Sequence, residues 1–229
     1  MKNSILESFN DNNIKLIPYM DNINEYSLKR YIDFGLAFIG LVIALPITLI
    51  ISLLIFLEDR GPIFYSQKRV GKLGKLFRTF KFRTMIVDSD AKFGPLQARE
   101  NDPRITKIGK LLRFTALDEI PQLWSILNGD MSFVGPRALL PAEKETSNNM
   151  SDEIISVEEI PGYEKRILVK PGLTGIAQIF APRDIDRKNK FRYDSLYLNN
   201  ISLFFDLKLI ILSLYITIKG SWEKRGNKI

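Results

Sequence analysis

The stretch that decides the fold is FGLAFIGLVIALPITLIISLLIFL, residues Phe34 to Leu57, in which no residue carries a charge. As an α-helix rising 1.5 Å per residue, it would extend about 36 Å, enough to cross the hydrocarbon core of a bilayer. A signal peptide is not expected, because the apolar region is long, begins late and is followed by no small-residue cleavage site. The sequence therefore predicts a membrane protein.

The proline and the flanks of this segment bear on whether it crosses the membrane or turns back. Pro46 divides it into about 12 and 11 residues, each half a bilayer long as a helix, and proline kinks helices. Lys29 and Arg30 precede the segment, and basic residues also follow it: Arg60, Lys68, Arg69, Lys72 and Lys75. Because Lys and Arg mark the cytoplasmic side, both ends point to that side. This favours a re-entrant helix kinked at Pro46 over a kinked spanning helix, in which proline is also tolerated.

The sequence predicts a helix-rich α+β fold in three parts. These are a polar N-terminal extension (1–27), the re-entrant membrane helix (28–57) and a small cytoplasmic, membrane-associated domain (58–229) with short strands and interfacial amphipathic helices. The apolar stretch 201–219 is interrupted by Asp206 and Lys208 and is too short to span. Either an interfacial helix along the headgroups or a buried C-terminal core helix fits this pattern.

Glycine, proline and periodicity predict the other elements of the domain. Residues 60–84 read as turns and short strands, and residues 102–129 mainly as helix. The acidic stretch 142–160 is expected to be a surface helix or a loop. A short strand is expected over Lys165 to Lys170, between two Pro-Gly pairs.

The composition excludes several kinds of chemistry. With no Cys and no His, the chain has no Cys nucleophile, no His base, no Ser-His-Asp triad and none of the usual Cys/His zinc sites. Carboxylate, amine and hydroxyl chemistry remains, with hard cations such as Mg²⁺ as the metals to expect. The absence of disulfides fits a reducing compartment.

Positive charge is concentrated between residues 60 and 113, which hold 14 Lys and Arg against 4 Asp and Glu, while the whole chain has a net charge of +7. Such a block suits anionic headgroups, phosphorylated substrates or nucleic acid. Nucleic acid is not expected, because no recognition module is present and a membrane anchor makes it awkward. In residues 77–84, which read FRTFKFRT, cations alternate with aromatics as on a half-buried strand with its charges on one face. This pattern favours phosphate binding over headgroup contact alone.

The adjacent carboxylates Asp118 and Glu119 are the best candidates for chemistry. A structural alternative exists, because Thr115-x-x-Asp118 matches a capping box and acidic residues complement the dipole of a helix start. Arg113 and Arg137 lie nearby in the sequence, and such arginines can keep a carboxylate ionised while holding a phosphorylated substrate. Without Cys or His, an Asp nucleophile is the natural route to covalent phosphate chemistry.

Several ordered blocks resemble the bacterial sugar transferases, the monotopic polyprenol-phosphate phosphoglycosyl transferases. The resemblance covers about residues 28–219. Its pieces are Lys29-Arg30-x-x-Asp33, Gln67-x-Arg69-x-Gly71, Lys81-Phe-Arg83-Thr-Met85, Lys107-x-Gly-x-Leu-Leu-Arg113, Leu117-Asp118-Glu119-Ile-Pro-Gln122, Asn128-Gly-Asp-Met-Ser-Phe-Val-Gly-Pro-Arg137, Lys170-Pro-Gly-Leu-Thr-Gly175 and the region from Asp194 to Asp206.

The resemblance implies a re-entrant enzyme of the bacterial inner membrane, with its catalytic domain on the cytoplasmic face, that initiates polysaccharide or glycoconjugate synthesis. Asp118 would attack the β-phosphate of a UDP-sugar and form a phosphosugar-aspartyl intermediate. Glu119 would then assist attack by undecaprenyl phosphate, and Mg²⁺ would bind near Asp118. Phosphate or nucleotide binding is expected of four basic residues: Lys81, Arg83, Arg113 and Arg137.

The chain departs from the family pattern in four motifs. The Ser-Pro pair of the membrane kink is Leu45-Pro46, and the Pro-Arg-Pro motif ends in Ala138. The Thr-Gly-Trp-Ala-Gln motif has Ile176 for Trp, and the Asn-Gly-Arg that follows it is Phe180-Ala181-Pro182, with Arg183 one place later. If this loop contacts the sugar or the nucleotide, these changes predict an unusual sugar donor. The sugar, the pathway and any homo-oligomer stay open, and the rival function is a membrane-anchored binding or scaffolding protein that needs neither Asp118 nor Glu119.

Overall fold

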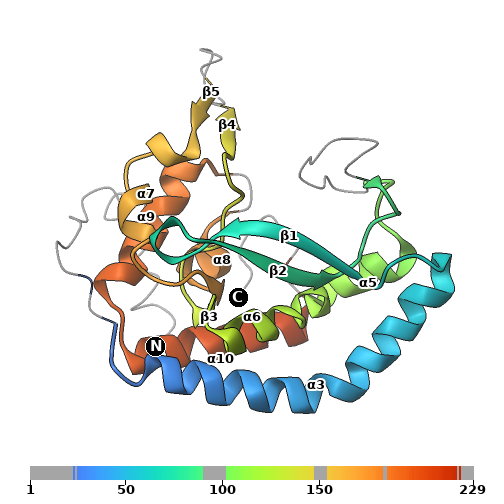
Figure 1. The fold of residues 1–229 in the computed structure, drawn as a ribbon. Coiled ribbons are helices and arrows are strands. Elements are labelled where there is room, and N and C mark those ends of the chain that lie inside the picture. Colours follow the sequence, from blue (N-terminus) through green and yellow to red (C-terminus); the bar gives the residue numbers. More distant parts are fainter. Residues whose placement is uncertain are drawn as a thin grey trace.

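The structure is a computed structural model that describes residues 23, 25–89, 102–146, 154–182, 185–220 and 222. Most of the N-terminal extension and Arg183 lie outside the described residues. The elements, labelled as in Figure 1, are α3 (Lys29–Asp59), β1 (Phe64–Val70), η1 (Lys72–Gly74), β2 (Leu76–Phe82), α5 (Lys107–Thr115), η2 (Leu117–Glu119), α6 (Gln122–Asn128), β3 (Ser132–Val134), β4 (Lys144–Thr146), β5 (Ile154–Ser156), η3 (Val157–Glu159), α7 (Tyr163–Arg166), β6 (Gly172–Thr174), α8 (Ile176–Phe180), α9 (Arg187–Asn199) and α10 (Leu203–Lys219).

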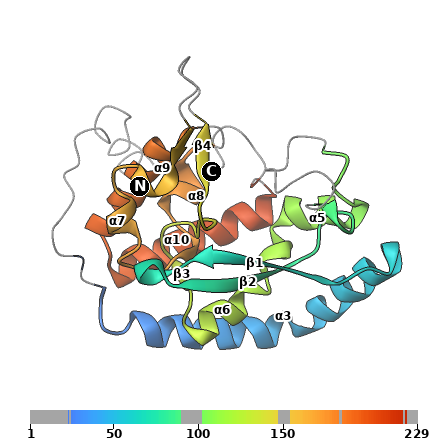
Figure 2. The ribbon, with the colours of Figure 1, turned by 45° about the horizontal axis from the view of Figure 1, so that its top comes forward.

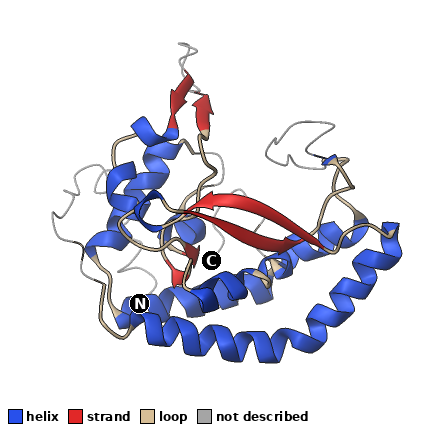
Figure 3. Cartoon of the chain, viewed as in Figure 1, coloured by secondary structure: helices blue, strands red, loops and turns tan. Residues whose placement is uncertain are grey.

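The expected helix-rich α+β class is confirmed: helices predominate, and the strands form small two-stranded sheets (Figure 3). β1 and β2 pair antiparallel, with Gln67 opposite Thr79, whereas β3 and β6 pair parallel. Residues from β3, α8, α9 and α10 make up the largest apolar core cluster. The β1–β2 hairpin lies above α3 and α6 (Figure 2).

The membrane segment forms one helix, α3, which contains Pro46 and bends along its length (Figure 1). The helix is long and apolar enough to cross a membrane. No residue between Ala37 and Ile51 is buried, and Ile43 near the middle is 73% exposed. The middle of α3 therefore presents an apolar surface that the protein itself does not cover.

Ion pairs and hydrogen bonds of charged side chains attach the N-terminal end of α3 to the domain. The buried Lys29 ammonium lies 2.5 Å from the Asp206 carboxylate of α10. Arg30 donates to two carbonyls in the last turn of α6, both at 2.6 Å, where a cation complements the helix dipole. Gly129 follows these carbonyls with a φ of +90°, and a Cβ there would lie 3.1 Å from the Arg30 guanidinium. A larger residue at position 129 would therefore crowd this contact.

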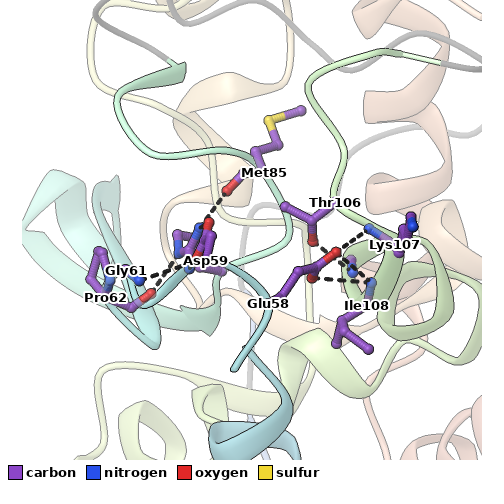
Figure 4. A network of polar contacts seen from close by, with 10 residues as sticks. Glu58, Asp59, Gly61, Pro62, Met85, Thr106, Lys107 and Ile108 are labelled. Carbon is purple, nitrogen blue, oxygen red and sulfur yellow. Dashed lines mark hydrogen bonds and ion pairs between the residues drawn. The ribbon is translucent and has the colours of Figure 1, made fainter. Parts of the chain in front are cut away.

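The C-terminal end of α3 is fastened to the same domain (Figure 4). Asp59 pairs with Arg83, which follows β2, and one of the two contacts measures 2.5 Å. Glu58 accepts a hydrogen bond from the amide of Lys107 at 2.7 Å and from that of Ile108 at 3.3 Å, so its carboxylate complements the start of α5. Both ends of α3 thus contact one domain.

Three predictions about local structure are wrong. Residues Tyr163–Arg166 form a helical turn rather than a strand, because Gly162 takes a left-handed φ of 100° and starts the turn. In the stretch 142–160, of which residues 147–153 lie outside the described residues, the structure has β4, β5 and the 3₁₀ turn η3 instead of the surface helix or loop expected. The charges of 77–84 do not share one face. Arg78 and Lys81 are three residues apart on β2, so their side chains point to opposite faces, and Arg83 lies beyond the end of the strand.

Helix α10 has two different faces. Asp206, Leu209 and Ile216 are buried against the domain. Phe204, Ile211 and Ile218, spaced at seven residues, are 85%, 65% and 87% exposed. The buried-core alternative therefore describes one face of this helix, and the other face is an apolar stripe open to its surroundings.

Candidate active site

The two adjacent carboxylates lie in the single 3₁₀ turn η2, between α5 and α6. Ala116 ends α5 in the left-handed region, with a φ of 55°, and so turns the chain between Thr115 and Asp118. The expected capping box is absent: the Thr115 hydroxyl donates back to the Leu111 carbonyl at 2.9 Å, and η2 has no side-chain cap. Asp118 and Glu119 are thus free of a capping role.

Lys81 of β2 joins the two carboxylates. Its ammonium forms an ion pair with Glu119 and lies 3.9 Å from Asp118. All three side chains are partly buried, with 13–24% of each exposed. The strand β2 therefore supplies a cation within reach of both acids.

The two acids have opposite pKa shifts. Burial raises the pKa of Asp118 to about 6, although Lys81, Arg113 and Arg137 act in the other direction. Burial also disfavours the charged form of Glu119, but Lys81, Arg137 and Arg69 together lower its pKa below the usual value. At neutral pH both carboxylates are mainly ionised, and Asp118 is the more basic of the two.

The structure brings three of the four expected basic residues to the carboxylates. Besides Lys81, Arg113 and Arg137 lie close enough to lower the pKa of Asp118. Arg113 also donates to the hydroxyl of Thr84 at 3.0 Å. Arg83 is elsewhere: its guanidinium is engaged by Asp59 and by two backbone carbonyls. The structure therefore does not place Arg83 with the other phosphate-binding candidates.

Arg69 of β1 is a further basic residue of the site that the sequence analysis quoted in a motif but gave no role. Burial, together with the nearby Arg137, lowers its pKa to about 10, so it stays protonated at neutral pH. Tyr65, Gln67 and Arg69 are alternate residues of β1, so their side chains share one face of the hairpin. Lys81 lies opposite Tyr65, and this period of two could therefore have predicted that Arg69 lies on the same face as Lys81.

Four of these residues, Arg69, Lys81, Glu119 and Arg137, line an open hollow beside Glu119, whereas Asp118 and Arg113 are not among the residues that line it. Three cations and one carboxylate give the hollow a positive surplus, which suits an anionic ligand. The lining comprises Arg69, Thr79, Lys81, Glu119, Gln122, Met131, Arg137, Ala138, Gly172 and Leu173.

The fold and this site define a membrane-associated protein with a cationic, carboxylate-containing site, and sequence comparison identifies its class. Residues 24–220 match the family model of the bacterial sugar transferases, so the chain belongs to that family. The resemblance predicted from the motifs is confirmed.

Relatives across bacteria agree with this assignment. The galactosyl transferase CpsE of Streptococcus agalactiae is 36% identical over 91% of this chain and 47% of its own length. The UDP-glucose:undecaprenyl-phosphate glucose-1-phosphate transferase of Klebsiella pneumoniae is 36% identical over 89% of this chain and 43% of its own length. The exopolysaccharide production protein PSS of Rhizobium leguminosarum is 37% identical over 80% of this chain and 91% of its own length. The chain thus spans less than half of the first two relatives and most of the third.

Proposed function

We propose that this chain transfers a sugar-1-phosphate from a UDP-sugar to undecaprenyl phosphate and so initiates the synthesis of a cell-surface polysaccharide. The observation that carries the proposal is Asp118, a partly buried carboxylate that lies 3.9 Å from Lys81 and has a raised pKa of about 6. A carboxylate of this kind is more nucleophilic than an ordinary one and still mainly ionised at pH 7. The names of the relatives support both substrates.

In the first half-reaction, an oxygen of Asp118 bonds to the β-phosphorus of the donor. The bond from that phosphorus to the bridging oxygen breaks, and UMP leaves with the bridging oxygen. Lys81, Arg113 and Arg137 offset the negative charge that the nucleophile must approach. The product is a phosphosugar-aspartyl intermediate.

In the second half-reaction, a phosphate oxygen of the lipid attacks the same phosphorus and the bond to Asp118 breaks. This step releases the lipid-diphosphate sugar and restores the carboxylate. Glu119 assists by holding Lys81 beside the reacting group, because the lowered pKa of Glu119 keeps it ionised and paired with Lys81.

The carboxylates of the site also fit a magnesium ion that is shared with the substrate. Among the described residues, no three acidic side chains gather into a metal site of their own. Mg²⁺ typically uses one or two carboxylates together with substrate phosphates, and Asp118, with Glu119 beside it, supplies that set. When bound, the ion would offset the charge of the diphosphate.

We also propose that α3 is re-entrant. The two ends of this helix, at Lys29 and Asp59, each pair with the same domain, and its apolar middle is exposed. A spanning helix would place its ends on opposite sides of the membrane, where one small domain could not reach both. The basic flanks favour the cytoplasmic face of the inner membrane. In this arrangement, the apolar stripe of α10 lies on the membrane surface.

The test is UMP release by purified protein in detergent with Mg²⁺, undecaprenyl phosphate and a panel of UDP-sugars. We expect lipid-dependent release from one donor, abolished in Asp118→Asn and unchanged in Glu159→Gln, an exposed carboxylate away from the site. A phosphosugar trapped on wild-type protein should be absent from Asp118→Asn. Full activity in Asp118→Asn would show that Asp118 is not the nucleophile. No UMP release by the wild-type protein, and no phosphosugar on Asp118, would favour the scaffolding alternative, in which amides at both carboxylates are harmless.

A further inference from the structure

The main chain around Arg137 is held by an unbroken row of hydrogen bonds. Each of four consecutive carbonyls, from Pro136 to Leu139, accepts one. Backbone amides hold the outer two, and guanidinium groups hold the inner two. The donors are Gly172 N to Pro136 O at 2.9 Å, Arg166 Nη2 to Arg137 O at 2.7 Å, Arg69 Nη1 to Ala138 O at 3.2 Å and Val70 N to Leu139 O at 2.9 Å.

Arg166 is itself rigidly held. Its side chain is buried in the turn α7, and its Nε lies 3.1 Å from the buried Asp194 carboxylate of α9. Its guanidinium also lies 4.5 Å from the centre of the Phe191 ring. A guanidinium held by a carboxylate and an aromatic ring has few alternative positions, so it fixes the Arg137 carbonyl to the core of the domain.

Arg69, which lies on β1, donates to the carbonyl of Ala138. Its second amino group donates to the Gln67 side chain at 2.6 Å. Arg69 therefore approaches residues 137–138 from the hairpin, whereas Arg166 approaches from α7. The two arginines hold neighbouring peptide groups from different parts of the fold.

This arrangement matters because Arg137 is a long, exposed side chain that reaches the hollow beside Glu119. Among the described residues, no hydrogen bond or ion pair engages its guanidinium. The residue after it, Ala138, leaves φ free, whereas a proline would fix it. The direction of Arg137 therefore depends on contacts with the main chain.

We propose that Arg166, held by Asp194, and Arg69 are positioning residues that fix the main chain of Arg137 and Ala138 and so aim the Arg137 guanidinium at the phosphate of the sugar donor. The inference rests on the proposed function. It makes donor binding depend on two residues outside the hollow, Arg166 in α7 and Asp194 in α9. Arg69 also lines the hollow, so the test uses Arg166 and Asp194.

The experiment replaces the buried pair with apolar side chains, Arg166→Met together with Asp194→Leu, because such exchanges often preserve the fold. We expect the KM for the UDP-sugar to rise roughly tenfold, as for the loss of one charged hydrogen bond, while kcat changes little. Arg192→Met, on the same helix α9 but bonded only to Asn189 among the described residues, is the matched control and should leave the KM unchanged.

The decisive comparison repeats the exchange in an Arg137→Ala background. If Arg166 acts through Arg137, the added exchange should change the donor KM no further. Equal effects in both backgrounds would overturn the proposal, and so would an unchanged KM in the folded double variant. If the double variant does not fold, Arg166→Lys serves instead: lysine can stay paired with Asp194 but cannot bridge to the Arg137 carbonyl as well. An inactive wild-type protein would instead count against the proposed function.

Discussion

Arg83 and Asp59 form a two-point ion pair that joins the end of β2 to the last residue of α3. Two residues before Arg83, the same strand carries Lys81, which pairs with Glu119. The strand β2 therefore connects the C-terminal end of α3 with the candidate active site. Glu58 adds a second connection, because it binds the first amides of α5, the helix that carries Arg113.

Breaking this junction should destabilise the protein. Asp59→Asn removes a charged partner from the buried Arg83, which should cost about 1–3 kcal/mol. For a domain of this size, this corresponds to a fall of about 2–12 °C in the unfolding temperature. The measurement is thermal unfolding in one detergent, with Arg60→Gln, an exposed neighbour, as the control. An unchanged Tm in Asp59→Asn would show that the pair contributes nothing to the fold.

The stability lost in Asp59→Asn should depend on pH in a defined direction. The hydrogen bonds from Arg83 are the largest contribution that lowers the pKa of Asp59. A carboxylate whose pKa is lowered on folding stabilises the folded state at pH values above its ordinary pKa. This stabilisation is lost as the pH falls through the lowered pKa. We therefore expect the difference between wild type and Asp59→Asn to be full at pH 7 and to shrink only below about pH 4.

Much of the site could be predicted from local sequence. The charge-free run predicted α3, and Asp118, Glu119, Lys81, Arg113 and Arg137 do lie together. Arg83 could not be placed in this way, since its partner Asp59 lies 24 residues earlier and the pairing depends on how α3 returns to β2. The capping box matched the local pattern at Thr115 but failed, because the left-handed Ala116 ends one helix before the next turn begins.

The rate of the first half-reaction should follow the ionisation of Asp118. Its pKa of about 6 predicts UMP release that is constant above pH 7 and falls below pH 6. Removing a cation that lowers this pKa, as in Arg113→Gln, should move the midpoint upward. Initial rates between pH 5 and 8 measure both effects at saturating donor. A rate that stayed constant down to pH 5 would contradict the raised pKa.

The same carboxyl should destabilise the folded protein at neutral pH. Because its pKa is raised on folding, the folded state binds more protons between about pH 4 and 6, so stability falls as the pH rises through that window. Asp118→Asn cannot ionise and should unfold at a temperature a few degrees higher at pH 7, although we expect it to be inactive. At pH 4 the two proteins should unfold at nearly the same temperature.

Ala116 offers a test of backbone strain beside the site. Glycine adopts the left-handed conformation without the steric cost of a Cβ, so Ala116→Gly should stabilise the fold by about 1 kcal/mol. We expect activity to fall several-fold, because a freer hinge holds Asp118 less firmly. Ala142→Gly, which relieves a φ of 51° elsewhere, should stabilise the protein similarly without loss of activity. Equal activity in both variants would show that position 116 does not constrain the nucleophile.

The topology of α3 can be tested directly because the chain has no cysteine of its own. Single cysteines at exposed positions before and after the helix, Ser27→Cys and Lys68→Cys, should both resist a membrane-impermeant maleimide in intact spheroplasts. Both should react in inverted inner-membrane vesicles, whereas a spanning helix would expose one of them in spheroplasts. Pro46→Leu favours a straight helix, so a fraction of Ser27→Cys molecules should then become reactive from outside. If none does, the pairs at Lys29 and Asp59, rather than the proline, hold both ends of α3 on one side.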